Sequence, residues 1–388
     1  MSELKTRTAG HRQTANDGAS KPTSMLCAGL NAHSQLQAGT QADVRKFTPV
    51  EDISTPQKGA DVLFAGWSTT VFSSGNKIWT QGFQPISSTL GGNAAHEDIQ
   101  TRSVIGDHDG FLALLTTSGD LYTVFSSSDA QSATLQLMTT ESSPSIALIA
   151  FAGTGRIALT FKQAPNGNLC HIAEFNTLDR FLAWYRDPSD SDCYPDKHHM
   201  LPGRPAQLLA NTASFILLLE NGEVYSWGDP RHQSLGRAIN GEGTTKADVP
   251  GIVEALGGLK ITKIASGGWM SAAFSEDGAL YLWGAAGAPG HDRSIRCLRE
   301  AGAGEVALVE LLASAHDEPL DVIDVAIGDA HVAVATSDGR LFVVGDNKDG
   351  QLGLDSAEDF IEDWTEARGL SDVQRVVCGS NSTYVFVH

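Results

Sequence analysis

The sequence predicts an all-β fold, a closed seven-bladed β-propeller, and three observations lead to this prediction. A unit made of an apolar strand, a Gly-containing tip and a second apolar strand recurs along the 388 residues. Successive tips are 43 to 61 residues apart, a spacing typical of propeller blades with several strands each. The last unit lacks its second half, and the N-terminal end of the chain supplies one, so we expect the ring to close.

Three units in the second half of the chain define the repeat most clearly. Their second strands read VYSWG, LYLWG and LFVVG, and each ends six residues after the Gly of an Asn-Gly or Asp-Gly tip. Such tips favour tight hairpins with positive φ, and the alternation of apolar residues is typical of half-buried strands. Eleven residues before the tip Gly stands Gly267, Gly328 or Asn211. Asn tolerates a left-handed backbone better than other residues with a side chain, so we expect that conformation at all three positions.

Weaker copies fill the first half. Residues 78–82 supply a strand and closing Gly whose tip falls at Asn76 and whose opening position falls at Ala65. Two further tips are expected at Gly119 and Gly167.

The seventh copy is split between the two ends of the chain. Residues 376–379 (VVCG) match 325–328 (VAIG), and the segment 26–36 matches 342–352 in its Gly, Asn and Gln-Leu positions. The N-terminal strand is therefore expected to complete the last blade, which removes an exposed sheet edge. We expect one propeller over residues 23–388 and a mildly basic, disordered tail over residues 1–22.

The most complete unit, from Gly328 and His331 to the run Gly350-Gln351-Leu352-Gly353, resembles the repeat of the regulator of chromosome condensation family of seven-bladed propellers. The resemblance runs from residue 23 to the C-terminus and is strongest after residue 208. The residues that match as structural repeat positions are Gly222, Gly228, Gly267, Gly278, Gly284, Gly328, His331, Gly339, Gly345, Gly353 and Gly379.

Within that family, the turns at 65–68 and 267–269 and the ending 378–384 look most like the small single-propeller member that partners a JmjC-type histone demethylase. The small fungal α-tubulin suppressor, an adapter, is the next most similar. This resemblance implies a non-enzymatic protein–protein interaction scaffold, linked to chromatin or to a modification pathway. The alternative is guanine-nucleotide exchange on a small GTPase, with the connectors 187–205 and 285–320 as candidate elements, although no counterpart of the founding member's exchange wedge is recognisable. The chain leaves no room for a HECT domain, so ubiquitin ligation is not expected.

Composition restricts the partner and the compartment. The chain carries 27 Lys and Arg against 46 Asp and Glu, a net charge of −19, which argues against a surface that coats nucleic acid and favours a basic protein partner. Five widely spaced cysteines with no CxxC pair, and no long apolar segment, predict an intracellular protein of the nucleus or cytoplasm, without a membrane span. We expect a monomer.

Motifs for catalysis, metal or cofactor binding do not emerge. The chain has no GxSxG, HExxH or Walker-type loop, and the GEGTTK segment at 241–246 lacks the spacing of a phosphate loop. Cys193, His198 and His199 fall in a loop predicted over 187–205 that does not fix ligands in register. His331 is expected to be structural because Ser and Met stand at its equivalent positions.

Tryptophans supply the strongest binding candidates. Trp67 and Trp269 each lie two residues beyond the opening position of a unit, so both should reach the same face of the ring. They are either plugs of the channel mouth or aromatic anchors for a partner. Asp329 and Asn381, in the equivalent turns, are candidates beside them, whereas Trp227 and Trp283 are expected to pack between blades.

The segment 355–372 carries seven acidic residues and is either a solvated face or a steering patch for a basic partner. Phe360 and Trp364 are spaced i, i+4, which favours a short amphipathic helix, and Trp364 is a further candidate for partner contact.

Overall fold

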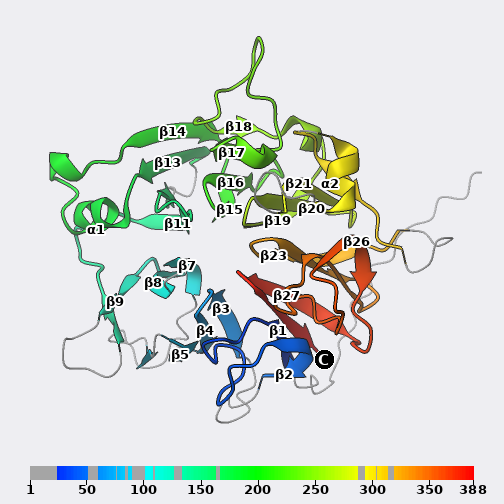
Figure 1. Ribbon diagram of the computed structural model, residues 1–388. Helices are drawn as coiled ribbons and strands as arrows, with labels where there is room; N and C mark the ends of the chain where they lie inside the picture. Colours follow the sequence, from blue (N-terminus) through cyan, green and yellow to red (C-terminus); the bar gives the residue numbers. More distant parts are fainter. Residues whose placement is uncertain are drawn as a thin grey trace, which may run out of the picture.

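The computed structural model describes residues 24–50, 60–75, 77–83, 86–89, 101–107, 110–125, 133–162, 167–286, 293–302, 304–312 and 319–388. In these ranges the chain forms seven four-stranded antiparallel sheets that stand around a central channel as the blades of a propeller (Figure 1). The predicted fold class is confirmed. The expected tail and the tip at Asn76 lie outside the described residues.

Six blades are continuous in sequence. Their strands, from the channel outward, are β3 (Asp61–Ala65), β4 (Thr69–Ser74), β5 (Lys77–Gly82) and β6 (Ser87–Thr89); β7 (Thr101–Asp107), β8 (Gly110–Thr116), β9 (Leu121–Phe125) and β10 (Thr134–Leu137); β11 (Ile146–Phe151), β12 (Ile157–Phe161), β13 (Leu169–Phe175) and β14 (Lys197–Pro202); β15 (Pro205–Ala210), β16 (Ser214–Leu219), β17 (Val224–Gly228) and β18 (Gly251–Ile252); β19 (Ile261–Gly267), β20 (Met270–Ser275), β21 (Leu280–Gly284) and β22 (Ala307–Val309); and β23 (Val322–Ile327), β24 (His331–Thr336), β25 (Leu341–Asp346) and β26 (Phe360–Glu366).

The seventh blade joins the two ends of the chain. It contains β27 (Val373–Gly379), β28 (Ser382–Val387), β1 (Ser24–Gly29) and β2 (Val44–Pro49) in that order. β1 pairs antiparallel with β28, with Ser24 opposite Val387 and Gly29 opposite Ser382. The corresponding pair in the sixth blade is Gly345 with His331, so the predicted register of the split repeat is confirmed.

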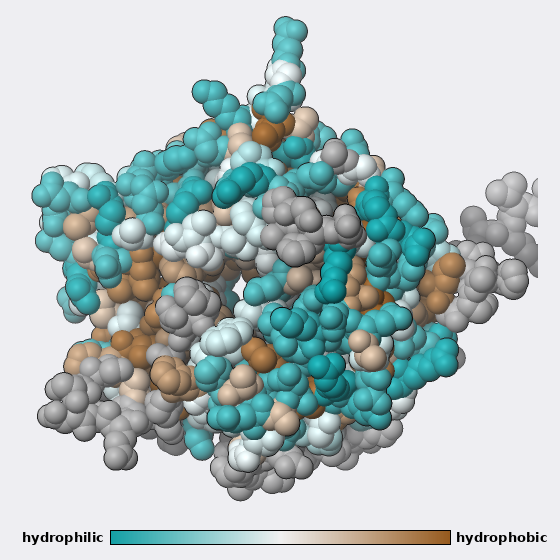
Figure 2. All heavy atoms as spheres, viewed as in Figure 1, coloured by the Kyte–Doolittle hydropathy of each residue, from teal (hydrophilic) through white to brown (hydrophobic). Residues whose placement is uncertain are grey.

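Strand direction divides the propeller into two faces. Because neighbouring strands are antiparallel, the turn from first to second strand and the loop from third to fourth strand share one end of each blade, which we name the loop face. The hairpin tips and the connections between blades share the opposite end. The seven first strands line the channel, a cavity of about 640 Å³ (Figure 2 shows the ring hollowed at its centre).

The core consists of apolar clusters between adjacent blades. The middle strands are buried on both faces, and every residue of β20 and of β24 is buried. Trp227 and Trp283 are fully buried, and their Nε1 atoms donate to a carboxylate oxygen of Glu174 at 3.0 Å and to the carbonyl of Ser234 at 3.1 Å. Both tryptophans therefore pack between blades, as the sequence indicates.

The repeat glycines serve two different purposes. The tip residues Gly222 and Gly339 adopt φ values of 90° and 83°, as expected for tight hairpins. Gly328 and Gly379 do not have positive φ, so the expected left-handed backbone at the opening position is wrong. A Cβ on Gly328 would lie 2.5 Å from the carbonyl oxygen of Gly379, and one on Gly379 2.5 Å from that of Ala65. These positions need glycine because the first strands of adjacent blades approach closely around the channel.

Helices are few in the described ranges, where the α-helices are α1 (Leu178–Arg186) and α2 (Arg296–Ala301). The helix expected around Phe360 and Trp364 is instead the outer strand β26. A spacing of four residues is even, so it also places two side chains on one face of a strand, and both rings pack on the cluster between the fifth and sixth blades. No helix in the described part of the chain is long and apolar enough to cross a membrane.

Candidate functional site

An exposed aromatic group lies on the loop face where the seventh and first blades meet. Trp67, in the turn between β3 and β4, is 46% exposed, and Phe83, directly after β5, is 73% exposed. The His33 ring, from the loop between β1 and β2, lies edge-on to both, with centroids 4.9 Å from Trp67 and 6.1 Å from Phe83. We call these three residues the Trp67 site.

Buried polar side chains hold this site in place. The Asn31 side chain accepts from the backbone N–H groups of Leu36 at 2.8 Å and Gln37 at 3.0 Å, which folds the loop back on itself. The buried Gln35 amide accepts from the His33 N–H at 2.9 Å and donates to the Trp67 carbonyl at 2.8 Å. One amide thus ties the His33 loop to the Trp67 turn, so the aromatic surface is preorganised.

A second site of related construction lies between the fourth and fifth blades. The His232 ring is 4.3 Å from the Trp269 ring, and the Arg231 guanidinium lies over the same indole at 5.6 Å. Asp229 accepts from Arg231 Nε at 2.8 Å, and this ion pair lowers the pKa of the Asp229 carboxyl. We call His232, Trp269 and Arg231 the Trp269 site.

The two sites are built from equivalent positions. His33 and His232 each follow the closing Gly of a third strand by four residues, and each contacts the tryptophan of the next blade. Both loops turn at the following residue, Ser34 with φ 59° and Gln233 with φ 60°. They differ at His232, which itself has φ 57°. Sequence reasoning missed these histidines, although their shared offset from the closing Gly was a usable signal.

The other candidates on the loop face lie beside the Trp67 site. Asn381 donates to Asp349 Oδ2 at 2.9 Å, and Asp349 occupies the position that His33 and His232 hold in their loops. Burial, and then the neighbouring Asp43 carboxylate, raise the pKa of Asp349. Asp329 is exposed at the channel mouth, yet the surrounding turns desolvate its carboxyl enough to raise its pKa. Asn381 and Asp329 thus share the loop face with the two tryptophans.

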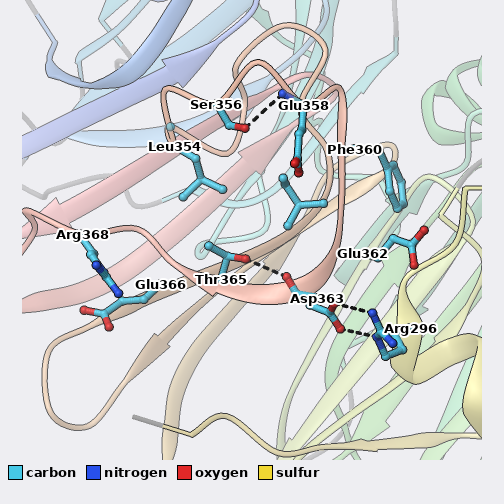
Figure 3. Close-up of a pocket in the computed structure, with 12 residues that line it drawn as sticks. Arg296, Leu354, Ser356, Glu358, Phe360, Glu362, Asp363, Thr365, Glu366 and Arg368 are labelled. Atoms are coloured by element: carbon cyan, nitrogen blue, oxygen red, sulfur yellow. Dashed lines mark hydrogen bonds and ion pairs between the residues drawn. The ribbon is translucent and has the colours of Figure 1, made fainter. Parts of the chain in front are cut away.

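Trp364 does not belong to this face. It lies in β26, at the outer rim of the sixth blade, next to a groove of about 810 Å³ that Arg296, Phe360 and Glu366 help to line (Figure 3). Much of the acidic segment here is already paired, because Arg296 forms a bidentate contact with Asp363 and Arg299 donates to Glu362 at 3.0 Å. The segment therefore clasps α2 to β26.

Residues with catalytic or metal-binding potential are engaged elsewhere. His331 is fully buried, its Nε2 lies 3.0 Å from Thr383 Oγ1, and burial lowers its pKa to about 4. His198 and His199 lie in β14 rather than in the loop expected over 187–205, and His199 contacts the buried Glu174 at 2.8 Å. Within the described ranges, no group of three or more His, Cys, Asp and Glu is arranged to hold a metal ion.

Comparison with known proteins agrees with the architecture. Residues 221–274 and 322–351 match the family described as "Regulator of chromosome condensation (RCC1) repeat". The chain is a seven-bladed propeller that carries repeats of this type.

Named relatives include RCC1 domain-containing protein 1 of Mus musculus, 31% identical over 239 residues, and its Homo sapiens counterpart, 30% identical over 219 residues. The matches span 52% and 47% of this chain, and 60% and 56% of the two relatives, little more than half of their length. Among solved structures, Prp20p of Saccharomyces cerevisiae has a TM-score of 0.64 at 14% identity and covers 95% of this chain and 92% of its own. Human WBSCR16 has the same TM-score and identity, with 94% and 100% covered. At this identity the two structures show the fold alone.

Proposed function

We propose that this protein is a non-enzymatic protein–protein interaction scaffold whose partner contacts the loop face at the Trp67 site. The observation that carries the proposal is the exposure of Trp67 and Phe83 side by side, on a loop fixed by the buried Asn31 and Gln35. Large aromatic side chains dominate the energy of protein interfaces, and a preorganised surface loses little entropy on binding. Trp269 is the weaker anchor because His232 and Arg231 already contact its ring.

The proposed partner is a protein with basic character, which the net charge of −19 would attract. Similarity to RCC1 domain-containing protein 1 makes a chromatin-linked or modification-pathway partner the first to test. The yeast propeller Prp20p, which shares the fold, binds histones, and this is consistent with a basic partner. The proposal places the protein in the nucleus or cytoplasm as a monomer, without cofactor.

The proposal is tested by affinity purification of the tagged, full-length protein from its own cells, followed by mass spectrometry. We expect a stoichiometric partner that Trp67→Ala combined with Phe83→Ala loses. Met200→Ala is the matched control, because Met200 is 61% exposed but lies in β14 at the outer rim of the third blade. A partner retained in full by the double variant would refute the proposed face.

The same purification separates the alternative function. Recovery of a small GTPase that is enriched when nucleotide is stripped would favour guanine-nucleotide exchange. That alternative is supported by similarity to the Mus musculus regulator of chromosome condensation, 32% identical over 145 residues, which are 36% of this chain.

A further inference from the structure

The Trp269 site contains an arginine that its counterpart lacks. Arg231 follows the closing Gly228 by three residues, and its guanidinium lies 5.6 Å from the Trp269 ring centroid. The residue three positions after Gly29 is Ala32, whose methyl group is too short to cover an indole. We infer that Trp67 receives an arginine side chain of the protein partner, in the place that Arg231 takes on Trp269. The inference rests on the proposed function and names the chemistry of the partner.

Exposure of the two indoles agrees with this difference. Trp269 is partly buried, whereas Trp67 is 46% exposed, although a histidine contacts both rings from the same loop position. Among the described residues, no Lys or Arg lies over the Trp67 ring. A guanidinium stacks on an aromatic face better than an ammonium does, because it is planar and more weakly hydrated. The site is therefore expected to prefer arginine to lysine.

The charges around the Trp67 site are compatible with an incoming cation. In the Trp269 site the guanidinium is paired with Asp229, and the equivalent residue near Trp67 is Leu30. Carboxylates come instead from Asp43, whose Oδ1 accepts from the Asn31 N–H at 3.1 Å, and from Asp349. The basic residues in this sector are Lys348 and Arg45, and Arg45 already donates to the Lys348 carbonyl at 2.9 Å.

The first test uses a defined probe on the full-length protein. The peptide acetyl-Gly-Arg-Gly-amide is titrated while the indole N–H signals of the seven tryptophans are followed by NMR, with Trp67→Phe assigning the signal. We expect a saturable shift of the Trp67 signal, and binding about fivefold weaker for the same peptide with neutral citrulline, which corresponds to a cation–π contribution of about 1 kcal/mol. No saturable shift, or equal binding of the citrulline peptide, would overturn the inference.

The second test fills one site from within and opens the other. Leu30→Asp combined with Ala32→Arg copies the Asp229 and Arg231 pair beside Trp67, and we expect this variant to lose at least fivefold in probe affinity. The reverse change, Arg231→Ala, is expected to let the Trp269 signal respond to the probe. An unchanged Trp269 signal in the first variant serves as the control for folding. Full probe binding by the filled variant would contradict the inference.

Failure of the inference and failure of the proposed function give different results. A partner that survives Trp67→Ala with Phe83→Ala refutes the proposed face itself. A partner that these changes abolish, but that tolerates Leu30→Asp with Ala32→Arg and is not displaced by the arginine peptide, leaves the face intact and rejects only the arginine contact.

Discussion

Arg375 of β27 forms a bidentate ion pair with Asp61 of β3, and this pair ties the last blade of the ring to the first. Both residues stand four positions before the end of their channel-lining strand. The same offset pairs Lys263 of β19 with Asp324, between the fifth and sixth blades. The pairs thus recur as a blade-to-blade connection in the wall of the channel.

Burial predicts unequal contributions from these two pairs. Arg375→Met is expected to lower the free energy of unfolding by less than about 1 kcal/mol, because both partners are over a third exposed. Lys263→Met should cost about 3 kcal/mol, because Asp324 is 4% exposed and would be left without its cation. Urea unfolding measures both, with Lys260→Met as a control in which the paired Glu276 is fully accessible to solvent at 62% exposure. Equal losses for Arg375 and Lys263 would contradict this order.

Removal of residues 1–29 is expected to cause aggregation. The deletion takes away β1, so the backbone edge of β28, which β1 covers from Ser24 to Gly29, would be exposed to other chains. Size-exclusion chromatography with light scattering measures the outcome, and a chain lacking only residues 1–22 is the control. A monodisperse monomer from the longer deletion would show that closure does not protect this edge.

His331 should make stability fall in mild acid. Burial lowers its pKa to about 4 from an ordinary value of 6.5, so below pH 6.5 the unfolded chain takes up a proton that the folded chain refuses. The free energy of unfolding is therefore expected to decrease by up to about 1.4 kcal/mol per pH unit between about pH 6.5 and 4. Denaturant unfolding across this range should show a shallower slope for His331→Ser than for the parent, whereas the exposed His171→Ser should leave the slope unchanged.

Arg237 is expected to hold the long loop between β17 and β18, which projects beyond the ring at the top of Figure 1. Its buried guanidinium donates to the carbonyls of Ser226, Thr245, Lys246 and Val249 at 2.7 to 3.1 Å. Arg237→Met leaves these carbonyls without a donor, so limited proteolysis should cut the variant within residues 238–250 much faster than the parent. The exposed Arg186→Met is the control, and equal cleavage rates would disprove the role.

Most of the architecture could be predicted from the sequence because each repeat fixes the register of the others. The offset of six residues between Gly339 and Gly345 located weak copies and the split blade, where composition alone was uninformative. Local spacing failed where two structures share it: the i, i+4 pair Phe360 and Trp364 suits a helix and a strand equally. Gly328 was attributed to backbone conformation because the neighbouring Gly379, 51 residues away, cannot be placed without the ring.

The aromatic candidates were found in part for the same reason. The equivalence of Trp67 and Trp269 is a property of the repeat and could be read along the chain. The contact between His33 and Trp67 joins two loops of different blades, so it depends on how adjacent blades meet. Which tryptophan is open could not be predicted, because it depends on whether the residue before the histidine is Arg231 or Ala32.

The pairing of β1 with β28 also sets a delay during synthesis. Ser24 meets Val387 across 363 residues of chain, so the apolar side chains of β1 have no partner strand on that side until the last strand leaves the ribosome. At typical elongation rates of 5 to 20 residues per second, this wait lasts roughly 20 to 70 s. Met25 and Cys27, both buried in the finished ring, stay accessible throughout that time. The nascent chain should therefore depend on holding chaperones for longer than its stability alone would require.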